Sequence, residues 1–260
     1  KMMDIVTLDF ETYYDKRYSL TRMNIPSYVS DPQFKVSGVA IRYPDGRVEF
    51  RTDVEALLRE LRARYGKRLE GVWVVMHNAP FDYFVLYHHY GQELVNIVDT
   101  RLLSHLLDSP ERSASLQSLA ERLGLPAKGD IEFLDGVRQP SVVQMAELAS
   151  YAKHDVELTY GVFSHFIEEA LAVPNEVTIA AHTVRIFVER PFWIDLLKVE
   201  EGLTALSDTI ESKLRAANLD RVSVSSDTKF RKLLEQALRR TGRAVPTKPG
   251  KNGPIPATAK

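Results

Sequence analysis

The chain has 260 residues, of which 44% are hydrophobic and none is cysteine, and its formal net charge is −1. A chain of this size can bury one good core with a smaller unit attached, and its composition excludes a disordered protein. Without cysteine there are no disulfides, thiolate zinc sites or cysteine nucleophiles, so a metal would need oxygen or imidazole ligands, which favours hard cations. No apolar run reaches the about 18 residues that span a bilayer, and no secretory leader is recognised, so we expect a cytosolic protein without membrane contact.

The charge is unevenly distributed along the chain. Residues 229–260 hold nine Lys and Arg against a single acid, Glu235, a balance of +8 that leaves −9 for the other residues. A basic segment beside an acidic body suits a protein that contacts phosphate with one part and metal with another. A solvated basic helix and tail is an equally good interpretation of the charge alone.

Hydrophobic periodicity predicts an α/β unit in the first part of the chain. Apolar alternation predicts three strands, at 3–10, 34–41 and 47–51, that pair antiparallel around the turn PDG. Strands then alternate with helices, which indicates that a mixed sheet continues with parallel strands. In chain order, these later elements are a helix from a cap at Asp53 to Tyr65, a strand at 72–77, a helix from a cap at Asn78 to Tyr90, a strand at 96–99, a helix at 100–107, a helix from Ser115 to Gly124, and two helices between 142 and 171.

After Pro174 only helical periodicity is found, so we predict a domain at 1–173 and a helical segment at 174–260. The helices of this segment are predicted at 176–189, 197–217 and 227–241. The chain then continues in TKPGKNGPIPATAK, a basic run rich in Pro and Gly that cannot pack a core and is expected to be flexible.

Two acids lie two positions apart on the first predicted strand, in the run IVTLDFET. Because successive side chains of a strand point to opposite faces, Asp9 and Glu11 project to one side while Val6, Leu8 and Phe10 project to the other. The two carboxylates can therefore share one cation. A pair of this kind is more often part of a half-exposed strand, but the apolar flanks argue against simple surface placement.

A second polar group, HNAPFD, comes at the end of the buried strand at 72–77. Asn78 and Asp82 are four positions apart on the predicted helix, and Phe81 can pack inward and fix its first turn. This point follows a parallel-type strand, where α/β proteins place their sites. The simpler interpretation is that Asn78 caps the helix and that Asp82 is a favourable charge near its N-terminus.

The third group is YAKHD, in which Tyr151 and Asp155 are four positions apart and emerge from one helical face. A phenol with a pKa near ~10 is a poor base at neutral pH but can orient a water molecule. The alternative is an amphipathic helix with Tyr151 half-buried; His154 points elsewhere and is interpreted as a surface residue. Four carboxylates from three separated segments together indicate a two-metal phosphodiesterase site.

These three groups resemble the motifs of the DEDDy 3′→5′ exonucleases of the ribonuclease H-like superfamily. DFET at 9–12 resembles the first motif, NAPFD at 78–82 the second, and YAKHD at 151–155 the third. A sister group has histidine five positions before the last aspartate, where this chain has Ser150, so the tyrosine version is the better match. The resemblance covers residues 4 to about 170 and implies a ribonuclease H-like mixed sheet flanked by helices.

The resemblance also implies catalytic residues and two Mg²⁺ ions, for which Mn²⁺ is expected to substitute. Asp9 would contact both ions, Glu11 and Asp155 the first, and Asp82, partly through water, the second. Tyr151 would orient the attacking water. The implied reaction removes nucleoside 5′-monophosphates from the 3′ end of single-stranded or frayed DNA. Implied substrate contacts come from Thr12, Asn78 and Phe81.

The helical segment carries a second, looser resemblance. From about residue 176 to 260 it is similar to the region of phage-type family A DNA polymerases that links the exonuclease to the polymerase domain. The palm and fingers motifs are missing, so we expect a monomeric proofreading part that normally works beside a polymerase domain on the same chain. Three alternatives stay open. The chain could be a naturally short, free-standing nuclease, a ribonuclease D-like exoribonuclease, which shares the DEDDy site, or a nucleic-acid-binding or docking module without nuclease activity.

Overall fold

The computed structural model describes residues 3–108, 112–129, 132–189, 194–248 and 255–256. The chain divides into two compact units, Lys1–Pro191 and Phe192–Lys260. The division comes after α7 (Glu176–Val188) and not after residue 173, because Val184 and Val188 of α7 are buried in the core of the first unit. Within the described ranges, no helix is both long enough and apolar enough to cross a bilayer.

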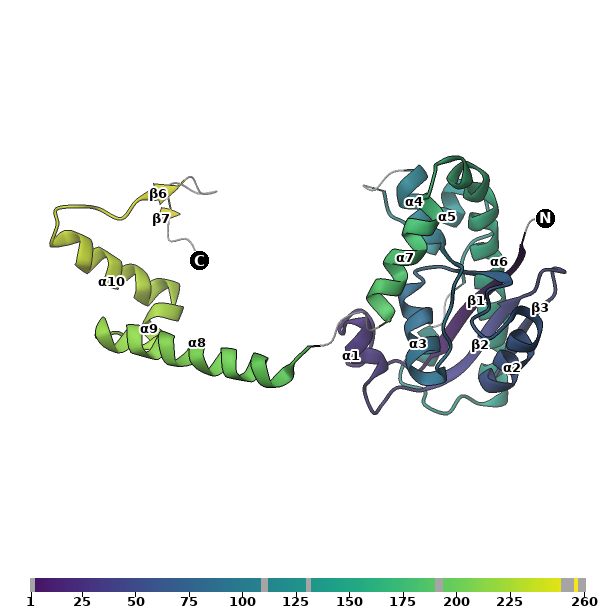
Figure 1. Cartoon of the computed structure of the whole chain (residues 1–260), viewed down its shortest axis with the longest axis horizontal. Helices are drawn as coiled ribbons and strands as arrows, with labels where there is room; N and C mark the ends of the chain where they lie inside the picture. Colours follow the sequence, from purple (N-terminus) through teal and green to yellow (C-terminus); the bar gives the residue numbers. More distant parts are fainter. Residues whose placement is uncertain (1–2, 109–111, 130–131, 190–193, 249–254, 257–260) are drawn as a thin grey trace. The chain divides into compact units, whose positions relative to one another are not determined.

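A five-stranded mixed sheet forms the centre of the first unit (Figure 1). The strand order is β3-β2-β1-β4-β5, in which β1–β2 and β2–β3 pair antiparallel while β1–β4 and β4–β5 pair parallel. This order confirms the predicted antiparallel start followed by parallel strands. The strands are β1 (Asp4–Thr12), β2 (Val36–Arg42), β3 (Val48–Arg51), β4 (Val72–Met76) and β5 (Ile97–Asp99).

Helices cover both faces of the sheet because β1 and β4 alternate between two apolar clusters. Val6, Leu8 and Phe10 of β1 join the cluster formed with α2 (Val54–Tyr65) and α3 (Pro80–Tyr90). Val75 of β4 faces the other way, into a cluster formed with α5 (Leu116–Leu123) and α6 (Val142–Ala172). The sheet is therefore the middle layer between two sets of helices.

Helix α6 is one continuous helix of 31 residues, so the prediction of two helices between 142 and 171 is wrong. It begins with a capping box in which the Ser141 hydroxyl accepts from the Gln144 N–H and the Gln144 side chain accepts from the Ser141 N–H. The only glycine inside the helix is Gly161. A Cβ there would lie 3.0 Å from the Leu125 side chain, so glycine makes room for that leucine rather than ending the helix.

The first unit also contains short helices that join the main layers. Helix α4 (Thr100–Leu107) follows β5 directly, and Asp99 caps it by accepting from the Arg101 N–H. Two short helical turns that the periodicity did not predict are α1 (Ile25–Val29) and a 3₁₀ turn at Glu132–Leu134. Pro26 stands in the first turn of α1, where its missing N–H costs no helical hydrogen bond.

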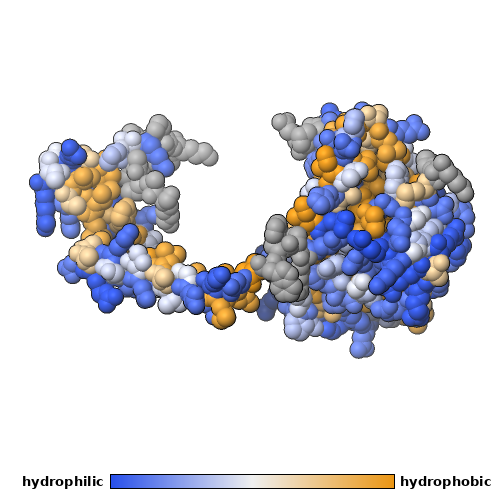
Figure 2. Space-filling view, in the orientation of Figure 1, coloured by the Kyte–Doolittle hydropathy of each residue, from blue (hydrophilic) through white to orange (hydrophobic). Residues whose placement is uncertain are grey.

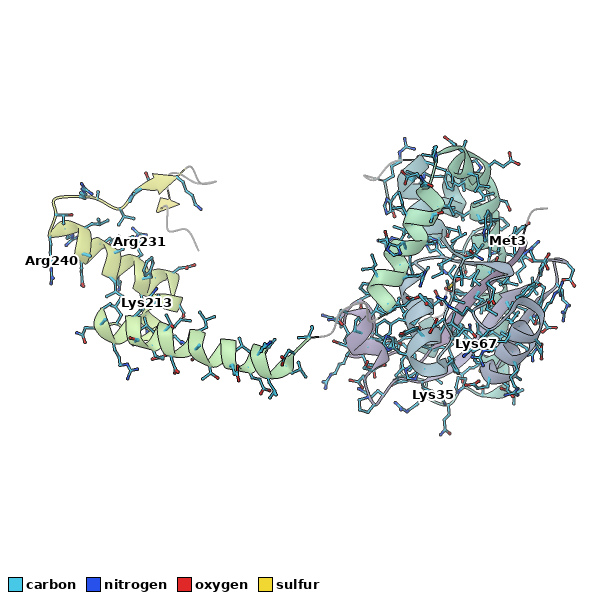
Figure 3. The ribbon with its side chains drawn as sticks, in the orientation of Figure 1. Met3, Lys35, Lys67, Lys213, Arg231 and Arg240 are labelled. Atoms are coloured by element: carbon cyan, nitrogen blue, oxygen red, sulfur yellow. The ribbon has the colours of Figure 1, made fainter. Side chains whose placement is uncertain are left out.

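The second unit contains α8 (Leu196–Ala216), α9 (Arg221–Ser225) and α10 (Asp227–Arg239), with a short pair of β6 (Thr247–Lys248) and β7 (Ile255–Pro256). None of its described residues at 194–248 is buried. Apolar side chains that face solvent are visible on it in Figure 2. Figure 3 shows basic side chains on the same unit, among them Lys213, Arg231 and Arg240. Most of the predicted flexible tail, 249–254 and 257–260, lies outside the described residues.

Candidate active site

The candidate site lies at one edge of the sheet, where the parallel strands β1, β4 and β5 reach their carboxyl ends. Asp9 and Glu11 are in the last half of β1, Asn78 comes two residues after β4, and Asp99 is the last residue of β5. The pairing of Met76 with Asp99 brings the ends of β4 and β5 level. Parallel strands gather polar groups at such an edge, so the topology brings together segments that are far apart in sequence.

Asp9 and Glu11 occupy the face of β1 that is opposite Leu8 and Phe10, as the strand periodicity predicted. Asp9 pairs with Ala40 of β2, and Ala40 packs against Ala152 and Val156 of α6. These small side chains allow α6 to lie close to β1 at this point. Helix α6 therefore carries the third motif over the first.

Asp82 is held against β1 by a main-chain contact. Its Oδ1 accepts a hydrogen bond of 2.9 Å from the Phe10 N–H, between the two acids of the first motif. The carboxyl is only 2% exposed. Burial raises its pKa well above the ordinary value, and the charge of Asp9 raises the pKa further. The second predicted motif therefore lies beside the first.

Asn78 is not the cap of α3, so that part of the prediction is wrong. The helix begins at Pro80, and Asn78 has a φ of +62°, in the left-handed region that asparagine tolerates better than most residues. The turn is fixed by Asp99, whose carboxylate accepts from the Asn78 N–H at 3.0 Å and the Ala79 N–H at 3.1 Å. The Asn78 side chain accepts from Arg101 at 3.0 Å.

Asp99 was not among the predicted site residues. It is 3% exposed, and burial raises its pKa to about 6 despite the backbone N–H groups that it accepts from. Its position before a helix could have been recognised as an N-cap, but its bonds to residues 78 and 79 span about twenty positions and have no local signal. Its contacts give it a structural role, which is to hold the second motif in place.

Tyr151 and Asp155 do emerge from one face of α6, as predicted, and a lysine lies between them and the solvent. Lys128 forms an ion pair with Asp155 Oδ2, and its Nζ is 4.7 Å from the centre of the Tyr151 ring. Asp155 is 4% exposed, and its other oxygen, Oδ1, is buried without a hydrogen-bond partner. His154 points away from this group and contacts the Ala127 carbonyl oxygen at 2.8 Å.

The acids are close enough to repel one another. Burial raises the pKa of Asp9 to about 7, and the charge of Asp155 acts in the same direction. Burial also raises the pKa of Glu11 well above its ordinary value, with further increases from Asp9 and Asp155. In both cases Lys128 acts in the opposite direction and lowers the pKa. The acids of three motifs and this lysine therefore form one electrostatic cluster.

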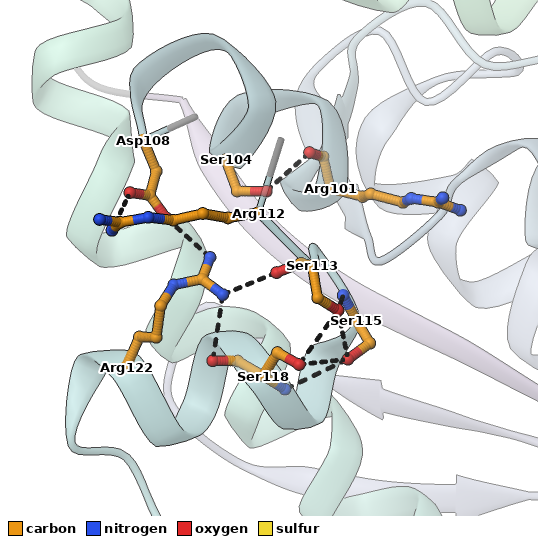
Figure 4. Close-up of polar contacts among 8 residues, drawn as sticks. All are labelled: Arg101, Ser104, Asp108, Arg112, Ser113, Ser115, Ser118 and Arg122. Atoms are coloured by element: carbon orange, nitrogen blue, oxygen red, sulfur yellow. Dashed lines mark hydrogen bonds and ion pairs between the residues drawn. The ribbon is translucent and has the colours of Figure 1, made fainter. Parts of the chain in front are cut away.

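A cavity of about 530 Å³ opens beside the cluster, and both acidic and basic side chains line it. Asp9 and Asp155 are the acids of its lining, and Arg101, Arg112 and Lys128 are its cationic groups. Figure 4 shows the polar contacts around Asp108, which accepts from both Arg112 and Arg122, at 3.1 Å and 2.7 Å, while the Arg101 side chain points away from this network. An anionic ligand would meet positive charge on entering.

His77 also lines this cavity. Its Nδ1 is 2.8 Å from the Thr100 hydroxyl oxygen. Burial lowers its pKa to about 4, and the nearby charges of Lys128 and Arg101 act in the same direction. The ring is therefore neutral at physiological pH, and it extends the polar lining without adding charge. Sequence analysis did not single it out.

The other two predicted substrate contacts are half-buried and partly engaged by the protein itself. The Tyr28 hydroxyl donates to the Tyr13 carbonyl oxygen at 2.6 Å, so the Thr12 hydroxyl, 2.9 Å away, donates to Tyr28. The Phe81 ring lies 6.1 Å from the Tyr28 ring. Both residues thus support the wall next to the first motif.

The oxygen-rich residues suit a hard divalent cation in their chemistry. The buried, unpartnered Asp155 Oδ1 and the raised pKa values of Asp9, Glu11 and Asp82 are relieved by a cation that binds carboxylate oxygens. Within the part of the chain that the structure describes, however, no three acidic or histidine side chains are gathered into a ready coordination sphere. The Lys128 ammonium contacts one of the oxygens that a cation would use.

Comparison with known proteins agrees with this arrangement. Residues 64–170 match the family described as 3′-5′ exonuclease, a range that includes the second and third motifs. No curated protein gave a significant match to the sequence.

Solved structures share the fold at low sequence identity. NrnC of Brucella melitensis with bound Mg²⁺ has a TM-score of 0.51 and 18% identity, over 72% of this chain and 85% of that one. The RNase D of Trypanosoma brucei has a TM-score of 0.52 and 13% identity, over 74% and 68%. The catalytic core of RRP6 from the same organism has a TM-score of 0.50 and 16% identity, over 71% and 46%. The chain thus shares the mixed-sheet fold of these solved structures, and its residues 64–170 match the 3′-5′ exonuclease family.

Proposed function

We propose that this protein is a metal-dependent 3′–5′ exonuclease that shortens single-stranded or frayed DNA and releases nucleoside 5′-monophosphates. One observation carries the proposal: carboxylates from β1, α3 and α6 form one electrostatic cluster, and Asp9 and Asp155 of this cluster line a cavity together with basic side chains. Such a cavity matches a substrate whose reacting phosphate must approach acids while its remaining phosphates need positive charge.

The proposed ligands for Mg²⁺ are Asp9, Glu11, Asp82 and Asp155, with Asp9 shared between two ions. Oxygen ligands and retained waters suit Mg²⁺, and Mn²⁺ should substitute. When bound, the cations would neutralise the acids, activate a water and stabilise the leaving 3′ oxygen. The solved structure of B. melitensis NrnC, which has a similar fold, contains Mg²⁺.

Tyr151 is proposed to orient the attacking water. Burial raises its pKa above the ordinary value, and the charges of Asp155 and Glu11 raise it further. The phenol therefore keeps its proton at neutral pH and donates a hydrogen bond, so it positions a water rather than deprotonating one.

The substrate end is proposed to lie in this cavity, in contact with both its carboxylates and its basic side chains. Arg101 and Arg112 would contact phosphates of the strand, and Asn78, held by Arg101, would line the path. Thr12 and Phe81 are proposed to contact the terminal nucleotide from the first-motif side. A single strand fits such a path because its unpaired bases can separate and stack on aromatic side chains.

A single digestion experiment tests the proposal. Single-stranded DNA labelled at either its 3′ or its 5′ end is incubated with the protein in Mg²⁺, in Mn²⁺ and in EDTA. We expect immediate release of a labelled mononucleotide from the 3′-labelled strand and a ladder of shortened products from the 5′-labelled strand, with no cleavage in EDTA. Release of mononucleotides from the 5′ end would reject the polarity, and cleavage in EDTA would reject the metal requirement.

The finer proposal is that the activity proofreads DNA beside a polymerase domain. The second unit supports it, because its helices have exposed apolar side chains and no buried residue, as expected of a segment that packs against a further domain. A proofreading enzyme should remove a mismatched primer end faster than a matched one. Equal rates on the two primer ends would argue against proofreading.

RNA is the second candidate substrate. The similar folds of T. brucei RNase D and RRP6 favour it, whereas the four carboxylates by themselves do not discriminate a 2′-hydroxyl. Matched DNA and RNA oligonucleotides of the same sequence separate the two candidates. We expect faster shortening of DNA, and a preference for RNA would replace proofreading with RNA processing as the proposed role.

A further inference from the structure

The loop at 125–129, which follows α5, runs along α6 and crosses the cluster of acids. Three of its residues contact α6 at successive positions along the helix. Leu125 fills the space beside Gly161, the Ala127 carbonyl oxygen contacts His154 Nε2 at 2.8 Å, and Gly129 approaches the ring of Tyr151 so closely that a Cβ would lie 3.2 Å away. The loop is therefore held on the helix on both sides of residue 128.

Lys128 is the one residue of this loop that extends its side chain into the cluster. Its ammonium group contacts Asp155 Oδ2 and lies over the Tyr151 ring, in an ion pair whose side chains are 24% and 6% exposed. It also lines the cavity together with Asp9 and Asp155. A partly buried lysine beside several buried acids neutralises part of their repulsion, which a cation would otherwise have to do.

We propose that Lys128 is the exchangeable counterion of the active site, which occupies the carboxylate of Asp155 in the metal-free protein and must be displaced before divalent ions bind there. The inference rests on the proposed function, because it assumes that Asp155 is a metal ligand. It gives Lys128 a role that the exonuclease motifs do not include: the lysine offsets part of the repulsion among the acids when no divalent ion is bound, and it sets the metal concentration at which the enzyme becomes active.

Metal affinity tests the exchange directly. In Lys128→Met the apolar stem is kept and the competing charge is lost, so Mn²⁺ measured by electron paramagnetic resonance should bind about 10-fold more tightly than to the wild type, the change expected for about 1.4 kcal/mol. Lys153→Met is the matched control, because Lys153 is an exposed lysine two residues from Asp155 on the same helix and should change the affinity less than about 2-fold. Unchanged or weaker Mn²⁺ binding by Lys128→Met would overturn the proposal.

Thermal unfolding adds a second readout that does not depend on turnover. Lys128→Met should melt below the wild type in EDTA, because the acids lose their counterion, and at the wild-type temperature in saturating Mg²⁺, because the ions replace it. If the melting temperature of Lys128→Met were lower than that of the wild type by the same amount in EDTA and in Mg²⁺, Lys128 would have a purely structural role, and the proposed exchange would be contradicted.

Lysine acetylation of the wild-type protein, followed by mass spectrometry, covers the case in which the variant does not fold. Lys128 should be protected in EDTA and become several-fold more reactive when Mg²⁺ is added, whereas Lys153 should react equally in both conditions. No change at Lys128 while Mn²⁺ binds would overturn the inference and leave the proposed function intact. Absence of both metal binding and hydrolysis in the wild type would instead overturn the proposed function.

Discussion

Helices α6 and α8 are the two longest in the described part of the chain, and they differ in what covers their apolar side chains. Helix α6 has 31 residues and buries ten of them against the sheet and its neighbours. Helix α8 has 21 residues and buries none. Its exposed apolar residues are Leu196, Leu197, Val199, Leu203, Leu206 and Ile210.

The spacing of these exposed residues, with Leu196, Val199, Leu203 and Leu206 at intervals of three and four, is the spacing of a helix face that packs against another surface. Periodicity therefore predicts a helix equally well in both units. It does not say whether the covering surface is in the same unit. If both catalysis and most of the folding stability reside in the first unit, substitutions there should strongly change turnover or the free energy of unfolding. Matched substitutions in the second unit should change both only slightly.

The largest difference between the two units is expected in turnover, when a carboxylate of the cluster is removed. Asp155→Ala should reduce hydrolysis of single-stranded DNA by about 10³-fold or more, because the site loses a ligand for the divalent ions. Circular dichroism should show that the variant stays folded, since removing one of several mutually repelling acids relieves the cluster. Asp195→Ala, which removes the N-cap carboxylate of α8, is the control and should leave turnover unchanged. Wild-type turnover by Asp155→Ala would show that the ligand assignment is wrong.

The next largest difference concerns stability. Leu58→Ala removes a side chain that is 1% exposed in the core between the sheet and α2, and it should lower the free energy of unfolding by about 2–5 kcal/mol. Leu206→Ala, at a position 56% exposed on α8, should change it by less than about 0.5 kcal/mol. Denaturant titration of both variants measures the contrast. A large loss from Leu206→Ala would show that α8 packs onto a surface of this same chain in solution.

The buried acids near the candidate site should dominate the pH dependence of the free energy of unfolding. Raised pKa values, about 7 for Asp9 and about 6 for Asp99, mean that these carboxyl groups bind protons more tightly when the protein is folded. Without metal, the stability that they contribute is therefore fully present below about pH 4 and is lost as the pH rises to 7.

His77 acts in the opposite sense between its ordinary pKa and about 4, but it is one group against several acids. In EDTA we expect a net loss on the order of 1–3 kcal/mol from pH 5 to 7.5, and Mg²⁺ should remove the part that comes from Asp9 while leaving that of Asp99. Thermal melts across this range, with and without Mg²⁺, make the measurement. Equal pH dependence in EDTA and Mg²⁺ would place the shifted groups outside the metal site.

Local sequence patterns were sufficient for the sheet and for most of the candidate site. The strand period places Asp9 and Glu11 on one face, and the helix period places Tyr151 and Asp155 on one face; both are found. The antiparallel start and the later parallel strands follow from the same patterns, because paired strands precede a region where strands and helices alternate. Their roles as ligands and catalysts stay predictions until activity is measured.

Contacts that depend on distant segments were not predictable. Asn78 looks like a helix cap locally, but the Asp99 carboxylate, about twenty residues away, holds the turn and leaves Asn78 with a positive φ. Lys128 lies in a loop without periodicity, and only packing on α6 carries it to Asp155. The continuity of α6 across Gly161 likewise depends on Leu125, a residue of another segment.

The smallest expected effect concerns the basic residues of the second unit. Arg239 and Arg240 end α10, and both are exposed. If the unit contacts the single strand, replacing both by glutamine should raise KM for long DNA a few-fold and reduce the slope of log affinity against log salt by about 1.4, since each single-strand phosphate contact contributes about 0.7. The catalytic rate at saturation should not change, because neither residue belongs to the first unit.

A salt titration of binding to long and short oligonucleotides measures this contribution. The short oligonucleotide, which reaches only the cavity beside Asp155, should bind both proteins equally. Replacing Arg59 and Lys67, two exposed cations of the first unit, by glutamine serves as a charge-matched control. An unchanged slope for the double variant on long DNA would mean that the basic helix is a solvated surface. Such a result would sharpen the contrast between the units, because nucleic-acid contact as well as chemistry would then belong to the first unit alone.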